Sequence, residues 1–125
     1  MLYTSPMEQL RIDSGPGSRE GVRILHLAGP FVLRSVAEFQ STVRTGNDRI
    51  IIVNLADVPF MDSAALGAIV GLHVSCQNQE RKYALVGVSS RLRMLFQVSG
   101  MEKILVTYRS VEEAEERLSA GAAAP

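Results

Sequence analysis

An aspartate and a serine, Asp62 and Ser63, stand side by side where a strongly apolar run gives way to a helical pattern. The first backbone N–H groups of a helix carry partial positive charge and attract anions. The fold would therefore tolerate a phosphate on Ser63, and that group would add about −1.5 to −2 charges to the surface. A phosphate at this place would therefore have the physical properties of a charge switch.

The same two residues also have a purely structural interpretation. Serine and aspartate are preferred N-cap residues, because their side-chain oxygens accept hydrogen bonds from N–H groups that a helix leaves unpaired. Either Asp62 or Ser63 would suffice as the cap. If Asp62 is the cap, Ser63 stays accessible to a kinase. If Ser63 is the cap, the motif marks no more than the start of a helix, and the sequence leaves both interpretations open.

Small residues follow Ser63 on the predicted helix, at Ala64, Ala65, Gly67, Ala68 and Gly71. The two glycines are four residues apart and share one helix face. We expect them to allow close packing of this helix on a sheet. Around the serine, the small side chains fit either a low surface for a partner or a helix that is buried near its start.

Other chemistry at Ser63 lacks the necessary residues. A nucleophilic serine needs a nearby base, but His26 is predicted mid-strand and His73 lies about three turns further along the helix. The chain contains no G-x-S-x-G turn and no G-x-x-x-x-G-K-[ST] phosphate-binding loop. Cys76 and two scattered histidines make no metal site. We therefore expect a protein that is not an enzyme and that uses no cofactor or metal.

Hydrophobic periodicity predicts the elements that position Asp62 and Ser63. Turn residues at 14–18 separate the first two strands, and a capping box at Ser110 and Glu113 begins the final helix. Strands are expected over residues 7–13, 22–28, 49–56, 83–88 and 104–108. Helices are expected from Leu33 to just before Gly46, from Ser63 to about Gln79, from Ser89 to just before Gly100, and from Ser110 to about Leu118. A flexible tail is expected over residues 120–125.

Strands that alternate with helices imply parallel βαβ units. The predicted fold class is thus α/β, a single domain with a small mixed sheet, an N-terminal antiparallel hairpin and about four helices. In the first of these helices, one face carries Leu33, Val36, Phe39, Gln40 and Val43.

The composition excludes several classes of partner. The 125 residues include 13 basic and 13 acidic side chains, which argues against a nucleic-acid or membrane surface. One cysteine excludes an internal disulfide. We see no signal peptide and no apolar run near the roughly 20 residues that span a bilayer. A cytoplasmic protein that is a monomer or weak dimer is expected.

Two segments resemble one known family. The run Ile51–Gly67 (IIVNLADVPFMDSAALG) is similar to the signature of STAS domains, especially those of bacterial anti-sigma factor antagonists. The run Arg93–Gly100 (RMLFQVSG) resembles a second family segment, a helix that ends in a Ser-Gly step. The resemblance covers about residues 7–118 and implies the fold class predicted above.

The resemblance also implies a function. In that family, a partner that is both a serine kinase and an anti-sigma factor binds ATP and phosphorylates the serine after the aspartate, which corresponds to Ser63. The unphosphorylated antagonist sequesters this partner, so a sigma factor is freed. By this resemblance, Asp62, Ser63, Ala64 and Ala65 would contact the partner. The alternative is a STAS scaffold or small-ligand sensor within a larger signalling complex, with Ser63 only a helix cap.

One segment departs from the family pattern. Many anti-sigma factor antagonists carry Gly-Glu-(Leu or Ile)-Asp after the second strand, with the aspartate near the kinase and its nucleotide. This chain has Gly29, Pro30, Phe31 and Val32 there, so both acids are absent. We expect weak recognition by a typical family kinase. Gly29 and Phe31 are predicted to contact a divergent partner instead, with the Phe31 ring exposed at the strand end.

Overall fold

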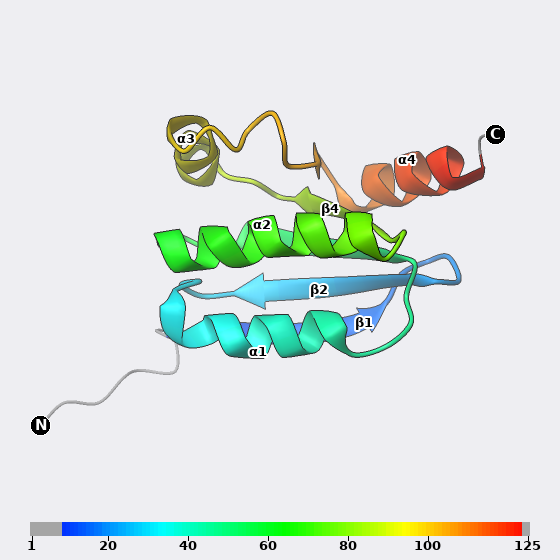
Figure 1. Cartoon of the computed structure of the whole chain (residues 1–125), viewed down its shortest axis with the longest axis horizontal. Helices are drawn as coiled ribbons and strands as arrows, with labels where there is room; N and C mark the ends of the chain where they lie inside the picture. The colour runs from blue at the N-terminus through cyan, green and yellow to red at the C-terminus, as the bar shows by residue number, and fades with distance from the viewer. Residues whose placement is uncertain (1–8, 124–125) are drawn as a thin grey trace, which may run out of the picture.

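The computed structural model describes residues 9–123, with side chains placed through residue 119 (Figure 1). This part of the chain forms five strands and four helices. In chain order they are β1 (Arg11–Pro16), β2 (Val22–Ala28), α1 (Leu33–Arg44), β3 (Ile50–Asp57), α2 (Ser63–Asn78), β4 (Lys82–Val86), α3 (Ser90–Val98), β5 (Thr107–Tyr108) and α4 (Val111–Ala123).

One mixed sheet runs through the centre of the molecule, with the strand order β1-β2-β3-β4-β5. β1 and β2 pair antiparallel, and every other neighbouring pair is parallel. β3 lies between β2 and β4 and is covered on both faces, which explains why Ile50 to Val53 are all buried and apolar. The predicted α/β class, with a hairpin followed by parallel βαβ units, is confirmed.

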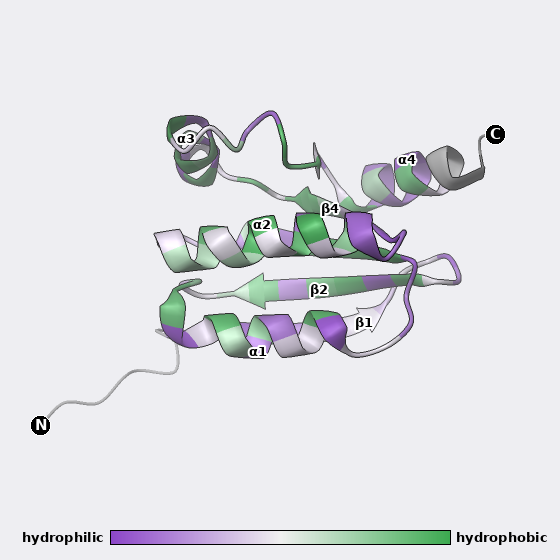
Figure 2. Cartoon of the chain, in the orientation of Figure 1, coloured by the Kyte–Doolittle hydropathy of each residue, from purple (hydrophilic) through white to green (hydrophobic). Residues whose placement is uncertain are grey.

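Helices cover both faces of this sheet. Phe39 of α1, Ile69 of α2 and Phe96 of α3 join the larger hydrophobic cluster on one face. Ala114 and Leu118 of α4 join a smaller cluster on the other face. Figure 2 shows hydrophobic residues along β4 and much of β2 and α2, and hydrophilic residues in the loop that follows α2. On their shared face of the sheet, α1 and α2 are in contact and lie side by side. Both helices begin at the end of the sheet where β2 and β3 finish (Figure 1).

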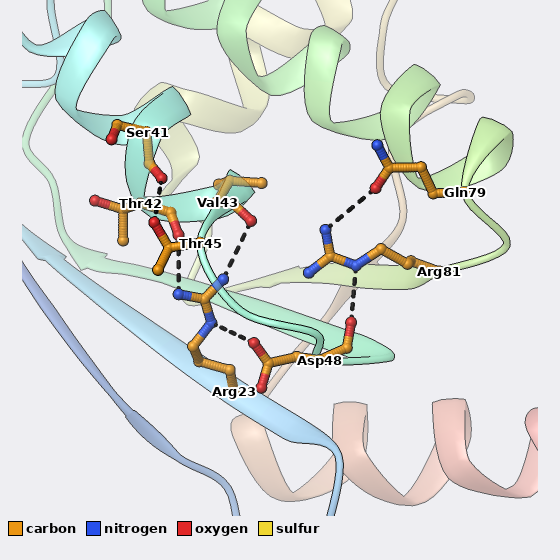
Figure 3. A network of polar contacts seen from close by, with 8 residues as sticks. All are labelled: Arg23, Ser41, Thr42, Val43, Thr45, Asp48, Gln79 and Arg81. Atoms are coloured by element: carbon orange, nitrogen blue, oxygen red, sulfur yellow. Dashed lines mark hydrogen bonds and ion pairs between the residues drawn. The ribbon is translucent and has the colours of Figure 1, made fainter.

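An arginine fixes the opposite end of α1. Arg23 donates hydrogen bonds to the carbonyl oxygens of Thr42 (2.8 Å) and Val43 (3.1 Å), which α1 leaves unpaired at its C-terminus. Its Nε also forms an ion pair with Asp48 Oδ2 at 2.8 Å (Figure 3). Arg81 Nε donates to the Asp48 carbonyl oxygen at 2.7 Å. These contacts tie the C-terminus of α1 to β2, and they tie the loop after α2 to the loop before β3.

A buried carboxylate ties α4 to the β1–β2 hairpin. Glu115 is 5% exposed and accepts hydrogen bonds from the Ser18 N–H (3.1 Å), the Ser18 hydroxyl (3.0 Å) and the Arg19 N–H (3.2 Å). Gly17 lies against it, because a Cβ there would stand 2.9 Å from Glu115 Oε1. The turn is thus fixed by a residue 97 positions away.

This contact explains why the predicted turn is misplaced. Ser14, Gly15 and Pro16 belong to β1, and the turn falls at 17–21. Pro16 is tolerated because β1 is an edge strand. Residues 7 and 8 of the first predicted strand lie outside the described residues.

Two predictions near the C-terminus are also wrong. The last strand is only Thr107–Tyr108, because the chain turns before it and the Leu105 N–H bonds to the Met101 carbonyl at 3.0 Å. α4 continues to Ala123, beyond its predicted end at about Leu118, in keeping with the high helix propensity of alanine. Residues 124–125 of the predicted tail lie outside the described residues.

Candidate functional site

Ser63 is the first residue of α2 and is exposed. The N-cap of this helix is Asp62, whose Oδ1 accepts a hydrogen bond from the Ala65 N–H at 2.9 Å. The interpretation of Ser63 as the cap is therefore wrong. Because Asp62 performs that task, the Ser63 hydroxyl is not required to begin the helix.

Asp62 also connects two helices. Its second oxygen, Oδ2, accepts a hydrogen bond from the Leu33 N–H at 3.0 Å. Leu33 begins α1, whose own N-cap, Val32, supplies no side-chain hydrogen bond. One carboxylate thus pairs otherwise unpaired N–H groups at the start of both α1 and α2.

A short backbone bridge holds the two loops that lead into these helices. Phe31 and Met61 form an isolated parallel bridge. The Phe31 N–H donates to the Phe60 carbonyl at 3.1 Å, and the Asp62 N–H donates to the Phe31 carbonyl at 3.3 Å. The β2–α1 loop and the β3–α2 loop, which leads to Ser63, are therefore hydrogen-bonded to each other.

The predicted exposure of Phe31 is wrong. Its side chain is completely buried, and its ring lies 5.0 Å from the ring of Phe39, centroid to centroid. Ala65 is buried as well. Neither side chain can touch a partner of the folded protein, whereas Asp62 and Ala64 are half-buried and lie beside the exposed Ser63.

Gly29 has a backbone role in this site. Its φ is +111°, a conformation that side chains rarely adopt, and a Cβ there would stand 2.7 Å from the Gln9 carbonyl oxygen. Its N–H donates to the Asp57 carbonyl at 3.0 Å. Gly29 therefore lets β2 end against β1 and β3, and it carries no side chain toward a partner.

The two glycines of α2 do not pack against the sheet, contrary to expectation. Gly67 and Gly71 are exposed, and a Cβ at either position would meet nothing within 4 Å. Ser63, Gly67 and Gly71 follow one another at intervals of four residues and so lie on one helix face. The helix backbone next to Ser63 on this face is therefore not covered by side chains at the two glycines. Close packing inside the fold does not explain these glycines.

Three large side chains on the segments around Asp62 were not predicted as site residues from the sequence. Leu33 shares the helical face of Phe39 and Val43, yet it is 69% exposed. Phe60 is 37% exposed, and the Arg91 guanidinium lies 5.6 Å from the centre of its ring. Residues in the first turn of a helix lie at the edge of the core, so periodicity alone cannot decide their exposure.

Both histidines have local partners. His26 Nε2 lies 2.8 Å from Asp57 Oδ2, and His73 Nδ1 lies 2.8 Å from the Tyr83 hydroxyl. Burial raises the pKa of Tyr83, and the hydrogen bond that its hydroxyl oxygen accepts from the Val106 N–H opposes this rise. Among residues 9–119, no three histidine, cysteine or acidic side chains are grouped to hold a metal ion. The site therefore offers a hydroxyl, a carboxylate and flanking apolar surface.

Sequence comparison identifies the family of this fold. The model of the STAS domain matches residues 18–114. This chain belongs to the STAS domain family. None of the helices in its described part is long and apolar enough to cross a membrane.

Curated relatives of this STAS domain are anti-sigma-B factor antagonists. The protein of Staphylococcus aureus (strain NCTC 8325 / PS 47) is 29% identical over 75 residues, which cover 60% of this chain and 69% of the relative. The protein of Staphylococcus epidermidis is 36% identical over 53 residues, 42% of this chain and 49% of the relative.

Solved structures share the fold. A putative anti-sigma factor antagonist of Thermotoga maritima has a TM-score of 0.77 at 21% identity, covering 86% of this chain and 94% of that one. The Bacillus cell fate determinant SpoIIAA in its phosphorylated form has a TM-score of 0.67 at 22% identity, covering 86% of this chain and 99% of that one. At these identities the likeness concerns the fold alone.

Proposed function

We propose that this STAS domain is an anti-sigma factor antagonist, a binding protein without catalytic activity of its own. In this proposal it sequesters an anti-sigma factor kinase when Ser63 is unphosphorylated and releases it when Ser63 carries a phosphate. The observation that carries the proposal is that Asp62 caps α2, so that Ser63 is exposed and not needed as the cap. The names of the curated relatives support the same class of partner.

The chemistry of the switch follows from charge. A phosphate adds about −1.5 to −2 charges next to the Asp62 carboxylate. To weaken a complex a hundredfold it must cost about 3 kcal/mol, at 1.4 kcal/mol per factor of ten. Two added charges at a contact that excludes water are sufficient for this, because they lose hydration and repel Asp62 and any acid on the partner.

The fold itself should accept the phosphate. The N-terminus of a helix stabilises a negative charge by about 0.3–1 kcal/mol, which offsets the repulsion from Asp62. Ser63→Glu should therefore change the melting temperature little while it weakens partner binding strongly. A large loss of stability in this variant would argue against a phosphate at Ser63.

The direct test is intact mass after incubation with ATP and each purified anti-sigma factor kinase from the organism that encodes this chain. One phosphate is expected on the wild type, and none on Ser63→Ala. Ser89 and Ser99 are internal controls, since they lie near the ends of α3. Labelling that persists in Ser63→Ala or that maps to either control serine would refute the assignment.

A second candidate function is a small-ligand module, and one feature favours it. An open groove of about 990 Å³ lies at the carboxyl ends of β2 and β3, the usual place for ligands in open α/β sheets. Its lining is mostly apolar and includes Leu10, Ala28, Val58 and Pro59. A rise in melting temperature with small amphiphilic molecules, abolished by Ala28→Phe, would support this function.

A further inference from the structure

Three loops meet at the carboxyl end of the sheet: one leads into α1, one into α2 at Asp62 and Ser63, and one into α3. The first two loops are joined by the bond from the Phe31 N–H to the Phe60 carbonyl and by the bond from the Leu33 N–H to Asp62. The third, which leads into α3, brings the Arg91 guanidinium to 5.6 Å from the Phe60 ring centre. Leu33, Phe60 and Arg91 thus come from separate segments: the Leu33 N–H bonds to the cap of α2, Phe60 lies in the loop before that cap, and Arg91 contacts Phe60.

We propose that Leu33, Phe60 and Arg91 form a docking surface for an anti-sigma factor that presents an apolar recess next to a carboxylate. The inference rests on the proposed function and names the chemistry of its partner. A single exposed leucine is ordinary on a protein surface. Here two large apolar side chains, one at the start of α1 and one in the loop before α2, are exposed near the predicted switch. α1 would begin as well with a polar residue at position 33.

The charge of this surface also specifies the partner. In the described part of the chain, Arg91 forms no ion pair with a carboxylate, while both Asp62 oxygens accept backbone hydrogen bonds. A carboxylate on the partner would pair with the Arg91 guanidinium. Phosphate on Ser63 adds about −1.5 to −2 charges and repels the same carboxylate.

The composition of this surface is that of an interface centre. Arginine and aromatic residues are enriched among the side chains that dominate binding energy, especially where apolar neighbours exclude water. The Arg91–Phe60 contact already orients the guanidinium, so less conformational freedom is lost on binding. We expect each of the three side chains to contribute to the affinity for the anti-sigma factor. Arg91 should also determine how strongly this affinity depends on salt concentration.

The experiment measures the dissociation constant of the anti-sigma factor that phosphorylates Ser63, for the wild type and for Leu33→Ser, Phe60→Ser and Arg91→Glu. Each variant should bind roughly tenfold or more weakly, and Arg91→Glu should also flatten the salt dependence. Met94→Ser and Val98→Ser are matched controls, because both side chains are exposed on α3, at 63% and 80%. They should bind within about twofold of the wild type.

Circular dichroism melting separates lost folding from lost contact. If Phe60→Ser does not fold, Phe60→Leu replaces it and should retain most of the affinity, since it keeps an apolar side chain. Wild-type affinity in all three docking variants, with Ser63→Glu still released, would overturn the docking surface and leave the proposed function standing. Equal weakening in the Met94 and Val98 controls would overturn it too. Wild-type affinity in Ser63→Glu would instead overturn the proposed function, and this inference with it.

Discussion

Asp62 and Leu33 are joined by a 3.0 Å hydrogen bond from the Leu33 N–H to Asp62 Oδ2, and this bond links the starts of two helices. Oδ1 of the same carboxylate holds the Ala65 N–H at 2.9 Å. A change at Ser63 that moves Asp62 must therefore also affect the start of α1. The exposed Leu33 side chain belongs to the residue that makes this bond. A shift of Asp62 would therefore also shift Leu33.

Asp62→Ala should destabilise the protein by about 1–3 kcal/mol, because two capping hydrogen bonds are lost at once. Asp62→Asn keeps one acceptor oxygen and should cost less. Urea denaturation gives the free energies of unfolding, and amide hydrogen exchange should show faster exchange of the Leu33 and Ala65 N–H groups in Asp62→Ala. Unchanged exchange at Leu33 would contradict the shared cap.

Phe31→Ala should destabilise the fold by about 3–5 kcal/mol, since it removes a completely buried ring from the α1 side of the core. Phe60→Ala is the matched control, because Phe60 lies in the adjoining loop and is partly exposed; it should cost less than about 1 kcal/mol. Chemical denaturation of both variants measures the difference. Similar costs for the two changes would contradict the buried position of Phe31.

Gly67→Ala and Gly71→Ala should each stabilise the protein by up to about 1 kcal/mol, because alanine is the better helix former and the added Cβ meets nothing within 4 Å. If the partner presses against this strip of α2, the same variants should bind it more weakly. Thermal melting and calorimetric titration measure the two effects. Stabilised variants with wild-type affinity would place the interface away from Gly67 and Gly71.

Local signals allowed much of this structure to be predicted from sequence. The apolar run that begins at Ile50 marks a strand with neighbours on both sides. Gly46, with a φ of +92°, directly follows Thr45, the C-cap residue of α1, as expected. The Asp62–Ser63 pair marks the start of α2. Each of these depends on residues that are close together along the chain.

What could not be predicted depends on contacts between distant residues. The hairpin turn is set by Glu115, which no pattern near Ser18 reveals. Phe31 is buried because a backbone bridge to Met61 turns its ring toward Phe39. Leu33 satisfies the helical pattern yet is exposed, because it is the first residue of α1 and lies at the edge of the core.

Stability should fall at alkaline pH because of the single thiol. Burial raises the pKa of Cys76, and the nearby Arg81 guanidinium opposes this rise. Below the ordinary thiol pKa of about 8.5, both the folded and the unfolded protein hold this proton, so its contribution is fully present. Above that value the unfolded chain loses the proton first, and the free energy of unfolding decreases as the pH rises toward the higher pKa of the folded state. The raised pKa of Tyr83 acts in the same direction at higher pH.

Urea denaturation at a series of pH values from about 7.5 to 10 checks this expectation. Cys76→Ala should flatten the decline through the thiol range, although the variant starts from a lower stability because the side chain is buried at 2% exposure. Thiol labelling gives an independent measure: Cys76 should react slowly in the native protein and rapidly in urea, since both burial and the raised pKa suppress the reactive thiolate. Rapid native labelling, or a wild type and a Cys76→Ala variant with parallel pH profiles, would show that the thiol ionises freely in the folded state.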